Sequence, residues 1–182
     1  MQEIFEGQFF WGIVVGLLLS FVGGWVQAKL TVAIAQKQQK KVVVKFCIDT
    51  IKNINNIVSE MDATRDRTRA IYLEFLTLID SEINVYDRNR EFLIHLPEPL
   101  RNEVRTFMNS CAVKKADISS RLLDCYELLK KIKLAQEEGR NSDAQQYEQA
   151  SIEPLQDAHR AADKLYEIVK DTSNLLTDLN RL

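Results

Sequence analysis

The scarcity of glycine beyond residue 24 is the feature that most restricts the fold of this chain. Five of the six glycines lie in the first 24 residues, and Gly139 is the only one among the rest of the 182 residues. That long remainder has three prolines and is rich in Leu, Lys, Glu, Asp and Arg. Folds that contain sheets need many tight turns, and tight turns depend heavily on glycine, so this composition predicts an all-α protein.

An uncharged stretch near the start of the chain predicts a transmembrane helix. Residues 9–26 read FFWGIVVGLLLSFVGGWV and contain one polar side chain, Ser20. As a helix this stretch is roughly 27 Å long, which nearly matches the hydrocarbon core of a bilayer at about 30 Å. Trp11 and Trp25 stand near its two ends, where indole rings favour the membrane interface. We therefore predict a transmembrane helix over residues 9–28.

The charges on either side of this stretch predict its orientation. Residues 1–8 carry no Lys or Arg, which argues against a cleavable signal peptide, the main alternative. Lysines follow the stretch instead, at positions 29, 37, 40, 41 and 45. This bias keeps the following segment in the cytoplasm. We expect residues 1–8 to be a short extracytoplasmic N-terminus and the C-terminal domain to be cytoplasmic, in an inner (plasma) membrane of bacterial type.

Residues 29–41 form a basic juxtamembrane segment. We expect Lys37, Lys40 and Lys41 to lie at the lipid headgroups, because anionic cytoplasmic lipids attract such cations. The chain contains three cysteines, an odd number at no metal-binding spacing, and all of them fall on apolar faces of the expected helices. This usage fits reduced core thiols in a cytosolic domain.

Small residues recur at every fourth position of the expected membrane helix. They are Gly12, Gly16, Ser20, Gly24 and Ala28. Helices in lipid associate through close backbone contact, which small residues at this spacing permit. The pattern therefore predicts a homo-oligomer that forms through the transmembrane helix.

Beyond residue 41, apolar residues recur in alternating steps of three and four, as in helices that pack along coiled-coil seams. The sequence Pro97-Glu98-Pro99 ends the first such segment, and Gly139 ends the second. We predict an elongated antiparallel three-helix bundle over residues 42–182, with helices at about 42–95, 99–138 and 142–182. The polar run 62–68 has no Gly or Pro, so we expect the first helix to continue through it. A break there, which would give a four-helix bundle, is the alternative.

Finer signals within the predicted bundle concern caps, a proline and the core. Ser142 and Gln145 predict a capping box at the start of the third helix. Pro154 is expected to kink or restart that helix, with Ser151 as a second cap. The seams predict buried positions at Val44, Cys47, Ile51, Ile54, Val58, Met61, Tyr72, Leu76, Ile79, Ile83, Tyr86, Leu100, Val104, Phe107, Cys111, Ile118, Leu122, Cys125, Leu129, Ile132, Ala158, Ala161, Leu165, Ile168, Thr172, Leu175, Leu179 and Leu182.

Residues that could carry chemistry are few. His95 and His159 are the only histidines, and each has a carboxylate one helical turn away, Glu91 and Asp163 respectively. This spacing lacks the ligand sets that helical metal sites need, so we expect no metal. No phosphate-binding glycine loop or nucleophile elbow is present, so no catalytic residue and no cofactor are expected. The net charge of -2 disfavours nucleic acid as a partner.

These observations predict a non-enzymatic, single-pass membrane protein. Its cytoplasmic bundle would anchor or scaffold a protein partner, within an oligomeric complex that also contacts membrane lipid. A different class remains as the alternative, namely a small pore-forming or membrane-perturbing effector assembled through the glycine-rich face of the span.

Overall fold

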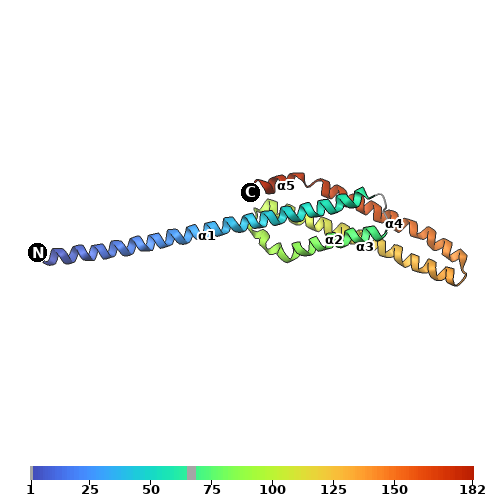
Figure 1. Ribbon diagram of the computed structural model, residues 1–182, viewed down its shortest axis with the longest axis horizontal. Coiled ribbons are helices and arrows are strands. Elements are labelled where there is room, and N and C mark those ends of the chain that lie inside the picture. The colour runs from blue at the N-terminus through green and yellow to red at the C-terminus, as the bar shows by residue number, and fades with distance from the viewer. Residues whose placement is uncertain (1, 65–68) are drawn as a thin grey trace. The chain divides into compact units, whose positions relative to one another are not determined.

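The computed structural model describes residues 2–64 and 69–182, and for residues 2–19 and Phe21 it describes the backbone alone. The described residues form helices and no strand. They are α1 (Gln2–Ala63), α2 (Arg69–Asn89), the 3-10 helix η1 (Arg90–His95), α3 (Glu98–Glu137), α4 (Asn141–Lys170) and α5 (Ser173–Asn180) (Figure 1). The prediction of an all-α fold is therefore confirmed over the described ranges.

The chain divides into two compact units, Met1–Val42 and Val43–Leu182. The first unit consists of the N-terminal part of α1, where every residue from Val22 to Gln39 is exposed. The predicted transmembrane helix over residues 9–28 falls mostly on side chains that lie outside the described part of the chain. Within the described residues, no helix offers a stretch long and apolar enough to cross a membrane.

The second unit is a bundle in which residues 43–63 of α1 pack with the four following helices (Figure 1). Polar contacts join neighbouring helices of the bundle. Asn53 Nδ2 on α1 donates a hydrogen bond of 3.2 Å to Glu82 Oε1 on α2. Lys115 on α3 pairs with Asp80 on α2 at 2.5 Å. Buried residues from all of these helices form a central core.

The first helix of the bundle does not continue to residue 95 as predicted. Helix α1 ends at Ala63 and α2 begins at Arg69, so the alternative with a break in the polar run is the observed one. In a continuous helix, Met61 and Tyr72 would lie roughly 16 Å apart along one axis. The break allows the chain to fold back, and both side chains become buried at 4% and 3% exposure. Burial of the two apolar seams against a shared core thus outweighs the helical propensity of the run between them.

The turn between α3 and α4 confirms the predicted role of Gly139. Its φ of 70° lies in the left-handed region, and the next residue, Arg140, donates its backbone N–H to the carbonyl of Ala135 at 2.8 Å. This is the bond pattern of a glycine C-cap. The predicted capping box at Ser142 and Gln145 is wrong, because α4 begins at Asn141 and has no side-chain cap bond at its start.

Helix α4 does not restart at Pro154 and Ser151 caps no new helix, so that part of the prediction is also wrong. Helix α4 continues through Pro154 to Lys170, and the interruption falls after it, before the short helix α5. Two features support α4 near the proline: it packs along α3, and Cys125 Sγ on α3 lies 4.0 Å from the carbonyl oxygen of Ser151. Packing against a neighbouring helix supplies contacts that an isolated helix would lack. These contacts offset the loss of the one backbone hydrogen bond that proline cannot donate.

Most of the predicted core positions are buried, including Leu122 at 1% and Leu165 at 0% exposure. Three predicted positions are only partly buried, namely Val44, Leu100 and Ile168. Leu129 and Leu182 are exposed, with 46% and 40% of their surfaces accessible. Figure 1 shows that the hairpin of α3 and α4 extends past the ends of α1 and α2. Beyond that point α3 has one neighbour instead of several, and a single neighbour covers a narrower stripe.

Candidate membrane-facing and interaction surfaces

The segment of α1 before the bundle exposes large apolar side chains over about half of its circumference. Val22, Trp25, Leu30 and Ile34 have 54%, 56%, 57% and 56% of their surfaces exposed. They do not share one face, so no single neighbouring helix would cover them all. The same segment also carries Lys29, Lys37, Lys40 and Lys41, so its surface is part apolar and part basic.

The predicted packing residues lie partly within this segment. Ser20, Gly24 and Ala28 are helical and exposed, and a Cβ added at Gly24 would meet no atom within 4 Å. Their spacing of four places them on one side of α1, so the surface they form is open to a second helix. Of Gly12 and Gly16 only the helical backbone is described, and the side chain of the interface residue Trp11 lies outside the described part of the chain.

The remaining interface residues are exposed to different degrees. Trp25 carries the ammonium group of Lys29 over its ring, with Nζ 3.8 Å from the ring centroid. Lys37 and Lys41 are exposed, and Lys40 is partly covered. A cation held against an indole ring is typical of side chains that bury an apolar portion and keep the charge in water.

The histidines do not form a metal centre in the described part of the chain, where no group of three or more candidate ligands occurs. His159 packs against Tyr72, with ring centroids 5.5 Å apart and the ring planes 37° from parallel. His95 is half-buried in η1. Each histidine is thus part of the packing between or at the ends of helices.

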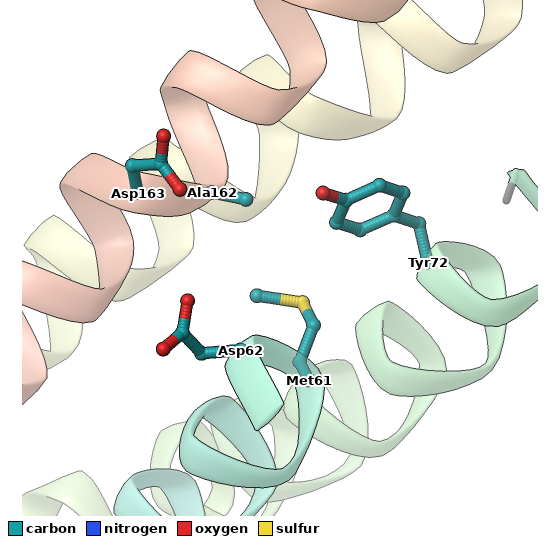
Figure 2. Close-up of a pocket in the computed structure, with 5 residues that line it drawn as sticks. All are labelled: Met61, Asp62, Tyr72, Ala162 and Asp163. Carbon is teal, nitrogen blue, oxygen red and sulfur yellow. The ribbon is translucent and has the colours of Figure 1, made fainter. Parts of the chain in front are cut away.

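A small pocket lies beside the contact of Tyr72 and His159. It is lined by Met61, Asp62, Tyr72, Ala162 and Asp163, which come from α1, α2 and α4 (Figure 2). The pocket brings two carboxylates and a phenol to one place, which is a combination that can transfer protons. Its volume is about 10 Å³, close to the least space that a single water molecule needs. A substrate would therefore not fit into it.

The two most deeply buried thiols are held in the protonated state. Burial raises the pKa of Cys47 to about 12, and burial raises the pKa of Cys111 to about 12 as well. A thiolate is the reactive form of cysteine, so these two side chains are poor nucleophiles and poor metal ligands. They pack as small apolar groups, in agreement with the prediction of core thiols.

The open hollow between α3 and α4 is lined mainly by charged side chains that pair with one another. Arg121 lies 3.7 Å from Asp157 across the two helices and also 3.7 Å from Asp117. Arg160 pairs with Asp157 as well. Positive and negative groups alternate here, so the hollow has no strong preference for an anionic or a cationic ligand.

An exposed apolar pair in η1 was missed by the sequence analysis. Phe92 and Ile94 have 47% and 67% of their surfaces exposed, while Leu93 and Leu96 beside them are buried. Arg101 of α3 donates hydrogen bonds to the carbonyl oxygens of Leu96 and Ile94 at 3.0 Å and 3.4 Å. The only signal in the sequence was the dense apolar cluster FLIHL before Pro97.

No protein-family model matches the chain, and neither a curated protein nor a solved structure matches it.

Proposed function

We propose that this chain is a non-enzymatic, single-pass membrane protein whose cytoplasmic helical bundle binds a protein partner and holds it at the membrane. One observation carries the proposal. The part of α1 before the bundle exposes Val22, Trp25, Leu30 and Ile34 over about half of its circumference, and it continues directly from the uncharged sequence of residues 9–21. Lipid would suit the uncharged stretch, because the backbone groups of a helix are already bonded and this stretch has almost no polar side chain.

The lysines support the orientation in this proposal. Lys37 and Lys41 are exposed, as are Lys29 and Lys45, so all four can interact with headgroups or with water. Basic residues directly after a membrane helix keep that side in the cytoplasm. The bundle over residues 43–182 would then lie in the cytoplasm of a cell with a bacterial-type inner membrane.

The surface of α3 and α4 supports binding of a protein partner. Large apolar side chains on these helices remain exposed, with 63% of Val113, 57% of Leu123, 53% of Leu134 and 54% of Ile152 accessible. Charged residues stand between them. We propose that the partner binds over these side chains, since binding would remove their apolar surface from water.

The test is a topology and extraction experiment on the full chain. A reporter that works only in the cytoplasm should be active when it is fused after Leu182. The protein should stay with the membrane after alkaline washing. Deletion of residues 9–28 should release the protein into the soluble fraction with its helical circular dichroism retained. Release of the intact chain by alkaline washing, or reporter activity outside the cytoplasm, would refute the proposal.

A further inference from the structure

One side of α1 before the bundle carries a largely apolar seam with the spacing of a coiled coil. Its members recur in alternating steps of three and four, and all of them are exposed. They are Trp25, Ala28, Val32, Ala35, Gln39 and Val42. Trp25, Val32 and Val42 have 56%, 57% and 69% of their surfaces exposed. Such spacing keeps side chains on one face of a helix. We refer to these six residues as the N-terminal seam.

The lysines of the same segment lie away from the N-terminal seam. At roughly 100° of rotation per residue, Lys37 and Lys41 lie on the opposite side of α1. Residues 22–48 contain no Asp or Glu, so no acidic side chain of this segment offsets its lysines. Lys29 lies at the edge of the seam, where its Nζ is 3.8 Å from the ring centroid of Trp25. The segment thus has one basic side and one uncharged side.

This separation of charge restricts what can cover the N-terminal seam. An acidic partner would bind the basic side, where the lysines attract it, and would leave the seam in water. A helix with the same separation of charge can pack on the seam while its own lysines point outward. The positions that flank the seam between Lys29 and Val42 are Thr31, Gln36 and Gln38, which add no charge to such a contact. A second copy of this chain supplies a helix of this kind.

We infer that two copies of the chain pair in parallel along the N-terminal seam and form a two-stranded coiled coil from Trp25 to Val42. This inference rests on the proposed membrane span, because spans with the same orientation in one membrane give both helices the same direction. The seam is short and two of its positions are alanine, so it would pair weakly in free solution. Two spans in contact raise the effective concentration of one seam near the other. Ala28 belongs both to the seam and to the small residues of the span, so the two contacts are continuous.

Gln39 sets the register of this pair. It is the only polar member of the N-terminal seam, and all the others are apolar or alanine. A single polar side chain in a coiled-coil seam specifies register at a cost in stability. When the two helices are in register, Gln39 lies opposite Gln39 of the second copy, and the two amide groups can bond each other. Every other seam residue then also lies opposite its own copy.

Disulfide formation by the full chain in membranes tests the pairing. Val32→Cys and Ala35→Cys should each give covalent dimers on mild oxidation, because an in-register pair places each cysteine beside its own copy. Ile34→Cys is the matched control, since Ile34 is exposed to 56% and Val32 to 57% but Ile34 lies on the lysine side. It should stay monomeric. The wild-type chain is the blank, because its three cysteines are buried.

A charge placed in the seam is the second test. In the Ala35→Cys chain, Val32→Lys would bring two ammonium groups together in the seam and should remove most of the covalent dimer. Leu30→Lys is its control, because Leu30 is equally exposed at 57% but lies on the lysine side. It should leave the yield of dimer unchanged. Equal yields from these two variants would overturn the inference.

The remaining outcomes separate this inference from the proposed function. Alkaline washing of the same membranes reports whether the wild-type chain is held by a span. If the chain is washed off, the proposed span fails, and the inference fails with it. If the chain stays in the membrane but neither Val32→Cys nor Ala35→Cys forms a dimer, the pairing alone is refuted. A yield from Ile34→Cys equal to theirs would also refute it, since that result indicates random collision instead of contact through one face.

Discussion

Two leucines one heptad apart on α3 have very different environments. Leu122 is 1% exposed and contributes to the shared core of the bundle. Leu129 is 46% exposed, although it stands at the same position of the seam. Leu122 belongs to the central core cluster and Leu129 does not. The cost of removing a side chain should follow this difference in burial.

We expect Leu122→Ala to lower the free energy of unfolding by roughly 2–4 kcal/mol, because it removes buried methyl groups and leaves a cavity. Leu129→Ala should cost less than about 1 kcal/mol, since nearly half of its surface already contacts water. Chemical denaturation of the full chain in detergent, followed by circular dichroism, measures both. Equal costs at the two positions would mean that α1 and α2 cover more of α3 than the structure places there.

At the residue scale, the sequence predicted the buried faces well and the surfaces poorly. Periodicity identifies which side chains share a face, and burial of the whole seam from Tyr72 to Tyr86 agrees with it. Periodicity says nothing about η1, where the 3-10 geometry removes the repeat of an α-helix. For this reason Phe92 and Ile94 read as part of an ordinary apolar run. Phe92 and Ile94 are exposed because Leu93 and Leu96 occupy the core positions of this turn.

At the scale of elements, helix ends were predictable where backbone conformation decides them. Gly139 ends α3 because its φ of 70° is unfavourable for other residues. The end of α1 at Ala63 and the continuity of α4 through Pro154 were not predictable in this way. Both depend on packing against helices distant in the sequence, and tertiary contacts override local propensity.

Replacement of Gly139 tests the role of its conformation. No atom lies within 4 Å of a Cβ added there, so Gly139→Ala meets no clash. The left-handed conformation should still cost the variant about 1 kcal/mol of stability. Gly139→Asn should cost less, because asparagine tolerates this conformation better. Thermal unfolding of the three proteins side by side measures the order. If Gly139→Ala is as stable as the wild type, the turn relaxes to another conformation in that variant.

At the scale of the whole molecule, the small residues of α1 concern association between chains. The small residues at every fourth position of α1 predict contact between spans, and Gly16 stands in the middle of that series. Gly16→Ile should hold two backbones apart and reduce crosslinking between chains in the membrane. Leu18→Ile, on another side of the helix, should leave crosslinking unchanged.

Crosslinking in membranes is measured together with ion leakage from vesicles. A scaffold should show no leakage in either form. If the protein is a pore, the alternative function, vesicles with the wild type should leak ions. Vesicles with Gly16→Ile should not, because that change prevents assembly. If crosslinking is unaffected by Gly16→Ile, the small residues are not the contact between chains.

The unequal lengths of the helix pairs give the bundle two levels of stability. Cys125, Ile132, Ala135 and Ala144 are buried between α3 and α4 but lie apart from the central cluster that all the helices share. The far end of the hairpin thus depends on one interface, much of it made by small side chains. Such a region opens at a lower free energy than the whole domain. The hairpin end can therefore unzip and reclose while the rest of the bundle stays folded, so its amide hydrogens would exchange with solvent before those of the central helices.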